Sequence, residues 1–354
     1  MKKVITILAL ALTTSVAFAQ DTPLEISGSA DLYYKYDFSK ASQLGTSFAT
    51  DQNSVSLGMI DVVLKKKTGK TSFVGEVSFG PRGQYQSILN TPGYAFINDP
   101  LIDDFPTLET SGESFHIQNL YASYAASDKL TLTAGYMGTF IGYEVISPLG
   151  NLNYSTSYLF TNGPFQNAGV KANYAISSKV GLMVGLFNDQ WNAYQANPSF
   201  GLNAIGAQLS LTPVEGLTAY INYLDGSASG TIVDLTAAYQ ISEKFKLGLN
   251  VADFSGTADD TGYTGFALYP SYAVSSNFSL ALRAENFKGK KNAITYSNVA
   301  ADESVTALTL SANLKSGGLT FIPEFRMDSG SANMFEGGAE KSASQISMAV
   351  VYGF

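Results

Sequence analysis

The 354-residue sequence contains no cysteine and a single histidine, and only 14% of its residues are charged. The absence of cysteine excludes disulfide scaffolds, zinc ribbons and thiol enzymes. The formal net charge is −8 at pH 7, so no basic surplus is available to neutralise phosphates, and we expect no nucleic-acid partner. What the chain has in quantity is aromatic residues and glycine, with 21 Tyr, 22 Phe and 33 Gly.

Residues 1–19 have the composition of a secretory signal. Lysines precede an apolar stretch at 4–16, and residues 17–19 are Ala-Phe-Ala, a small-residue cleavage site. A membrane anchor is the alternative, but the apolar stretch is shorter than the ~20 residues that a spanning helix needs. We therefore expect a signal peptide at 1–19 and a single domain at 20–354.

Apolar and polar residues alternate along this domain with a period of two, which is typical of strands with one buried face. Short turns rich in Ser, Gly and Pro interrupt the alternation at 68–70, 127–129, 177–179, 213–216, 242–244, 275–277 and 316–318. Longer connections lie between them at 39–52, 81–114, 142–164, 192–200, 226–230, 256–261, 289–303 and 330–342. The pattern predicts about 16 strands, with 14 or 18 left open.

A soluble β-sandwich or β-helix would also alternate, but its polar face would meet water and carry many charges. Here Ser, Thr, Asn and Gly dominate the polar face. Strands of ~10 residues that are tilted by ~40° cover about 25 Å, the height of a lipid-facing band. The predicted fold class is therefore all-β: a transmembrane antiparallel β-barrel with short periplasmic turns and long extracellular loops.

The last segment carries an apolar residue at every second position from Ile346 to Phe354. We expect Tyr352 and Phe354 to act as an assembly signal, which the barrel-assembly machinery would read by strand pairing. The predicted location is the outer membrane of a Gram-negative bacterium. Outer-membrane lipids and lipopolysaccharide are expected partners, and the acidic 81–114 segment is interpreted as a solvated loop rather than a metal site.

Several local strings carry a family resemblance: Leu-Glu-Ile-Ser-Gly at 24–28, Tyr-Tyr-Lys-Tyr at 33–36, Gly-Tyr-Glu at 142–144, Asn-Tyr-Ser at 153–155, Phe-Thr-Asn-Gly-Pro-Phe at 160–165 and Ile-Pro-Glu-Phe-Arg at 322–326. With the terminal strand, the chain resembles the OmpL-like β-barrel porin family over essentially all of 20–354. The resemblance implies an outer-membrane barrel that acts as a porin. It implies no particular substrate.

A barrel of this size should hold water, so we expect passive diffusion of small hydrophilic solutes or ions. The alternative is a non-conducting structural or adhesive barrel that acts through its external loops. No enzyme, cofactor or metal is expected, because His116 stands alone and no G-x-S-x-G string is present; we expect His116 at the lumen or rim. A monomer and a homotrimer both fit the sequence. Trp191, at the end of a predicted strand, is expected to be an interfacial anchor.

Side chains alternate between the two faces of a strand, so the charged residues on the face opposite the apolar one are expected to line the pore. The acidic ones are Glu25, Asp31, Asp37, Asp61, Glu76, Asp189, Asp234, Glu285, Glu324 and Asp328, and the basic ones are Lys35, Lys65, Arg82, Lys171, Lys246, Arg283 and Arg326. The acidic excess predicts a weak cation preference, since salt screens scattered charges.

The two longest connections, 81–114 and 142–164, are candidates for a constriction loop that folds against the inner wall. We favour 142–164, because the stretch 151–165 has no charge and carries large aromatic side chains that favour burial: Tyr154, Tyr158, Phe160 and Phe165.

Overall fold

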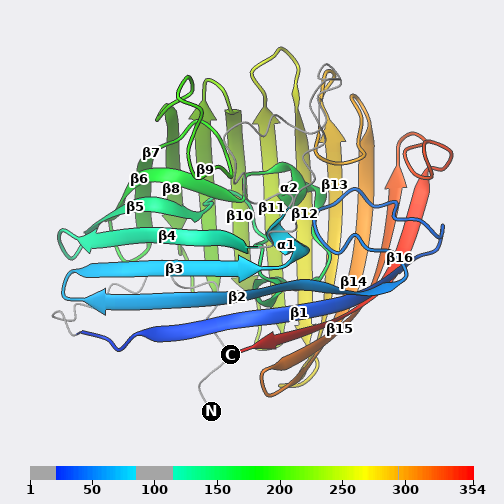
Figure 1. Cartoon of the computed structure of the whole chain (residues 1–354), viewed down its shortest axis with the longest axis horizontal. Helices are drawn as coiled ribbons and strands as arrows, with labels where there is room; N and C mark the ends of the chain where they lie inside the picture. The colour runs from blue at the N-terminus through cyan, green and yellow to red at the C-terminus, as the bar shows by residue number, and fades with distance from the viewer. Residues whose placement is uncertain (1–20, 85–114, 294) are drawn as a thin grey trace.

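The computed structural model describes residues 21–84, 115–293 and 295–354. Within them, sixteen antiparallel strands follow one another around a single closed barrel (Figure 1). The predicted fold class and the count of sixteen are confirmed, and each predicted short turn joins two consecutive strands. The expected signal peptide and most of the 81–114 connection lie outside the described residues.

The strands are β1 (Glu25–Asp37), β2 (Ser54–Thr68), β3 (Thr71–Phe79), β4 (Phe115–Ala125), β5 (Leu130–Gly138), β6 (Gln166–Ala175), β7 (Val180–Phe187), β8 (Ala204–Leu211), β9 (Leu217–Gly226), β10 (Gly230–Gln240), β11 (Phe245–Ser255), β12 (Gly262–Ala273), β13 (Phe278–Gly289), β14 (Ser304–Ser316), β15 (Leu319–Gly330) and β16 (Ser342–Gly353). Short helical turns occur in the connections: α1 (Pro81–Gln84), the 3-10 turn η1 (Pro148–Gly150) and α2 (Tyr158–Asn162).

The barrel closes by pairing its first strand with its last. The β1–β16 register runs from Ser29 opposite Gly353 to Asp37 opposite Gln345. Beyond it, the amides of Gly28 and Phe354 each donate to the carbonyl of the other residue, at 3.0 and 3.1 Å. Closure therefore leaves neither terminal strand with an unpaired edge, which is the requirement for strands in a lipid bilayer.

Burial alternates along the strands as the sequence pattern predicts. On β14, Val305 and Ala307 are 0% exposed, whereas Leu308 and Leu310 are 40% and 51% exposed. Successive side chains of a strand point to opposite faces, so the leucines lie on the outer surface of the barrel. No helix in the described part of the chain is long and apolar enough to cross a membrane.

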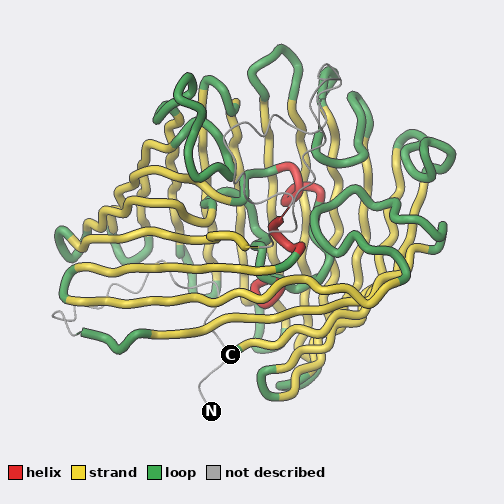
Figure 2. Tube along the Cα trace, in the orientation of Figure 1, coloured by secondary structure: helices red, strands yellow, loops and turns green. Residues whose placement is uncertain are grey.

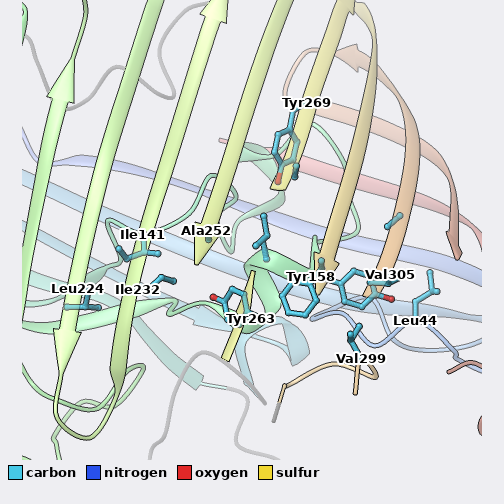
Figure 3. Packing of buried hydrophobic residues seen from close by; sticks show 14 of the residues in the cluster. Leu44, Ile141, Tyr158, Leu224, Ile232, Ala252, Tyr263, Tyr269, Val299 and Val305 are labelled. Atoms are coloured by element: carbon cyan, nitrogen blue, oxygen red, sulfur yellow. The ribbon is translucent and has the colours of Figure 1, made fainter. Parts of the chain in front are cut away.

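The larger buried apolar cluster lies inside the barrel (Figure 3). Strand residues such as Leu224 and Ile232 pack there with Tyr158, Leu44 and Val299, which come from the connections that Figure 2 draws in green and from α2. Part of the interior is thus filled by folded-in loops rather than by water.

Trp191 packs against this same cluster. Its ring lies 5.3 Å from that of Phe254, between centroids, and Phe254 stands on the same face of β11 as buried Ala252. The expectation that Trp191 is an interfacial anchor is therefore wrong. The connection that carries Trp191 folds toward the interior. The alternation of side chains along a strand could not predict the course of this connection.

Candidate pore constriction

The connection between β5 and β6, residues 139–165, enters the barrel and is called the inner loop below. It contains η1 and α2, and α2 contacts β12 and β13 (Figure 1). Tyr154 and Tyr158 are 0% exposed, and Phe160 and Phe165 are also buried. The four aromatic residues expected to make a constriction therefore lie within the protein, although their effect on permeation stays a prediction.

Glycines of the wall make room for side chains of the inner loop. A Cβ atom on Gly248 would lie 2.3 Å from the hydroxyl oxygen of Tyr143, and one on Gly206 would lie 2.7 Å from Cζ of Phe140. The Tyr143 ring is held there by stacking on Tyr269 of β12, with centroids 4.4 Å apart. A side chain at Gly248 would meet the inner loop, and one at Gly206 would meet both the loop and the ring of Phe187 on β7, whose Cε2 would lie 2.6 Å from the added Cβ.

Wall carboxylates bind the backbone of the inner loop. Glu324 accepts hydrogen bonds from the amides of Tyr154 and Ser155, at 2.7 and 3.1 Å. Glu285 accepts from the amides of Tyr158 and Leu159, at 3.0 and 2.8 Å. Buried amides need partners, and a carboxylate that accepts two of them makes strong charge-assisted bonds. The loop is therefore fixed by its backbone at two points.

Arginines bind the loop carbonyls. Arg283 donates to Oε1 of Glu144, within the loop, at 2.8 Å and to the carbonyl of Thr156 at 3.1 Å. Arg326 donates to the same carbonyl at 2.9 Å and pairs with Asp328 at 2.8 Å. Both arginines are 0% exposed. Opposite charges and loop dipoles thus compensate one another within the protein.

Two tyrosine hydroxyls complete the attachment. Tyr154 donates to Asp31 at 2.6 Å, and Tyr158 donates to Asp328 at 2.8 Å. Desolvation by burial raises the pKa of both tyrosines well above the ordinary value, so both remain neutral donors near pH 7. Arg82 lies over the ring of Tyr154, 4.7 Å from the centroid, and forms an ion pair with Asp31.

A second connection, residues 38–53, packs on the inner loop. Lys35 donates to the Ser42 hydroxyl at 2.7 Å and to the carbonyl of Thr50 at 2.9 Å, which anchors this connection to β1. The amide of Ser47 then donates to the Thr161 hydroxyl at 2.8 Å. Displacing either segment would therefore break contacts to the other.

Comparison with known proteins identifies the family. The family model described as "Putative beta-barrel porin-2, OmpL-like" matches residues 23–354. The chain belongs to this OmpL-like porin family. The resemblance expected from the local strings is thereby confirmed, and the protein is an outer-membrane β-barrel.

Solved outer-membrane proteins share the OmpL-like barrel's fold. The outer membrane channel DcaP of Acinetobacter baumannii is 12% identical, with a TM-score of 0.60 over 98% of this chain and 100% of that chain. OmpT of Vibrio cholerae in its trimer form is 11% identical, with a TM-score of 0.54 over 94% and 99%. A mutant of the Rh. blastica porin is 13% identical, with a TM-score of 0.57 over 94% and 100%. No curated protein matches the sequence.

Most of the charged residues expected to line the pore of this OmpL-like porin are buried and bonded. The buried ones on strands are Asp31, Lys35, Asp37, Asp61, Asp234, Arg283, Glu285, Glu324, Arg326 and Asp328. Lys65, Glu76, Lys171 and Lys246 are half-buried, and Glu25 is exposed. Their role in lining the pore stays a prediction.

Two further residues of the expected set, Arg82 and Asp189, are buried in connections rather than on strands. Asp189 accepts hydrogen bonds from the amides of Ala228 and Ser229, both at 2.8 Å, and so holds the turn between β9 and β10. Desolvation would raise the pKa of Asp189, but hydrogen bonds from the hydroxyls of Ser229 and Ser227, together with the two amides, lower it overall. His116 is 1% exposed, and its ring nitrogens have no hydrogen-bond partner in the described parts of the chain.

Sequence reasoning missed Glu144, whose carboxylate accepts from the Ser157 amide at 2.7 Å as well as from Arg283. It also missed Asn222 and Asn250, whose amides donate to Asp234, while Asp234 accepts from the amide of Gly142 at 3.0 Å. Glu144 lies in a connection, where side chains do not alternate between two faces, so its position in the sequence does not show which way its side chain points. The asparagines are uncharged, so a pattern of charged residues does not single them out.

Proposed function

We propose that this OmpL-like barrel is a passive channel for small hydrophilic solutes or ions, and that the inner loop sets its narrowest section. The observation that supports the proposal most is the fixing of residues 139–165 inside the barrel by Glu285, Glu324, Arg283 and Arg326. Barrels of eight strands fill with their own side chains, whereas sixteen-stranded barrels enclose enough space for an aqueous path beside an inserted loop.

We further propose a weak cation preference. Carboxylates outnumber basic groups among the expected lumen residues, but most of the carboxylates bind amides, hydroxyls or arginines. The Debye length is about 8 Å at 0.15 M salt, so the remaining charges act only at short range. Lys171 and Lys246 oppose the preference, because neither forms an ion pair within the described residues.

In a planar bilayer with a KCl gradient, we expect stepwise single-channel currents and a reversal potential displaced only slightly toward that of K⁺. The double variant Lys171→Gln with Lys246→Gln should shift it further in the same direction, because two uncompensated positive charges are removed. Lys179→Gln, in an exposed turn, is the matched control. A strongly anion-selective potential in the unaltered protein would contradict the proposed preference.

The second candidate is a non-conducting structural or adhesive barrel. The observation that favours it is the apolar cluster in which Leu44, Ile141, Val299 and Phe335 from four connections pack on the inner wall. The same bilayer recording distinguishes the two functions. Silence from a correctly folded barrel would support the second.

The proposed partners are outer-membrane lipids, lipopolysaccharide and the barrel-assembly machinery. The pairing of Phe354 with Gly28 supports a role for the last strand in closure, and we propose that Tyr352 and Phe354 are its assembly signal. A homotrimer is proposed from the fold shared with OmpT, for which a trimer form is described. We also propose that residues 1–19 are a signal peptide.

The proposed topology places the short turns in the periplasm and the long connections outside. Cysteines introduced singly at Ser178 and Asp259 test it, because both positions are exposed, one in a short turn and one in a connection at the other end. On intact cells, an impermeant thiol reagent should label Asp259→Cys and leave Ser178→Cys unlabelled until the outer membrane is opened. If only Ser178→Cys were labelled on intact cells, the proposed topology would be wrong and the short turns would face outside.

A further inference from the structure

The outer surface of β11 to β14 changes from apolar to polar along a defined line. The outward residues Val251 and Phe266, opposite each other on β11 and β12, are 39% and 47% exposed. The next outward-facing pair, two residues along each strand toward the long connections, is Asp253 opposite Thr264. On its other side, Thr264 lies opposite Lys288 of β13. This line marks the outer edge of the lipid-facing band.

The height of the apolar surface agrees with this assignment. On β12 the outward face is apolar or aromatic from Tyr272 to Phe266 and turns polar at Thr264. Strand residues rise ~3.3 Å each and are tilted by ~40°, so the distance from Tyr272 to Thr264 projects to roughly 20 Å, close to the ~25 Å of a lipid-facing band. Thr264 thus lies where acyl chains give way to headgroups.

A hollow of about 410 Å³ opens on this surface, across the line. Its apolar side is made by Val233, Leu235, Val251 and Phe266, and its polar rim by Asp253, Thr264 and Asn286. The floor at Gly265 and Ala252 is backbone, because the Ala252 methyl group points into the barrel and Gly265 has no side chain. We call it the outer groove. A concave surface with an apolar base and a polar upper rim fits a molecule that is itself apolar below and polar above.

Lysines stand immediately beyond the polar rim. Lys288, Lys290 and Lys291 lie within four positions at the end of β13. Lys290 donates to Asp253 at 2.8 Å and to the Ser255 hydroxyl at 2.8 Å, so it is fixed against the groove. Lys288 and Lys291 form no ion pair in the described parts of the chain. Two positive charges are therefore available to an anionic group at the height of lipid headgroups.

We propose that the outer groove binds a phosphorylated glycolipid of the outer leaflet, with an acyl chain against Val233, Val251 and Phe266 and a phosphate beside Lys288. Burying the methylenes of one chain and pairing one phosphate are the two contributions that anchor lipids to proteins. Thr264 and Asn286 place a hydroxyl and an amide between them, where sugar hydroxyls would lie. This inference rests on the proposed topology, which places the long connections outside, and gives the proposed lipopolysaccharide partner a site; it does not depend on conduction through the barrel.

Native mass spectrometry of the full, detergent-folded barrel tests the proposal, with hexa-acylated bisphosphorylated lipid A as the probe. Two variants alter different halves of the groove: Lys288→Gln with Lys291→Gln removes the charges, and Val251→Phe fills the apolar side. Each lysine near a lipid surface contributes roughly a fivefold gain in affinity, so the lysine variant should bind the probe about tenfold to thirtyfold more weakly. Val251→Phe should also weaken binding.

Matched controls separate a site from general lipid adhesion. Lys179→Gln with Lys244→Gln removes two lysines from short turns, and Val184→Phe enlarges an exposed residue on β7; both should bind like the unaltered barrel. Lipid A without phosphates should bind the unaltered barrel more weakly, with no further loss in the lysine variant. Equal binding by groove and control variants, or equal binding of phosphatidylglycerol, would overturn the proposal.

Discussion

A barrel that lacks residues 150–160 is expected to conduct about two- to fourfold more current than the intact protein at the same KCl concentration, since current rises with the open cross-section. The removed stretch contains Tyr154 and Tyr158, which are 0% exposed and belong to two buried clusters that each include wall residues and a residue of the connection 38–53. Removing them turns part of a packed interior into an aqueous path. Single-channel recording measures the change directly.

A second effect should accompany the larger current. Glu285 and Glu324 accept loop amides in the intact protein, and the deletion leaves both carboxylates facing the enlarged lumen without those partners. Their charge would then act on passing ions, so cation preference should increase. A barrel that lacks only Asp259 and Asp260, which lie in an exposed connection, is the control and should conduct as before. Unchanged conductance in a folded barrel without 150–160 would assign the constriction to 81–114.

Strand number and turn positions could be predicted from the sequence because both depend on local features. The alternation along β14 reflects the pleat of a single strand, and a turn such as 316–318 carries its own glycines. The pairing of Arg326 with Asp328 also follows locally, since residues two apart share one face of a strand. None of these inferences needs a residue distant in the chain.

The contacts of the inner loop could not be predicted in this way. Parity places Arg283 beside Glu285 on one stripe, yet its ion pair is with Glu144, 139 positions away. In the sequence, Gly248 only interrupts a strand; in the structure, the Tyr143 side chain occupies the space where a side chain of residue 248 would lie. Composition indicated that 151–165 favours burial, but the partners that bury it come from β1, β13, β14 and β15, which pattern alone does not bring together.

Among single substitutions, we expect Arg283→Met to have the largest effect on the inner loop. The guanidinium is 0% exposed and compensates the carboxylate of Glu144 together with the carbonyls of Ser155 and Thr156. Removing one partner of a buried ion pair typically costs about 3–5 kcal/mol, because the other charge is left uncompensated. Strand β13 keeps its ladders to β12 and β14, so this cost falls on the loop rather than on the barrel.

The expected result is a loop that leaves the wall roughly a hundred- to several thousandfold more often, because each 1.4 kcal/mol corresponds to a factor of ten. Limited proteolysis of the folded barrel should cut Arg283→Met within 139–165 and leave the unaltered protein intact, and recordings should show brief larger openings. Lys171→Met is the matched control, since that lysine has no ion pair in the described residues. Adding Glu144→Gln to Arg283→Met removes the uncompensated charge and should restore part of the protection. If Arg283→Met instead lowers the unfolding midpoint of the whole barrel without exposing the loop, the guanidinium stabilises the wall and not the constriction.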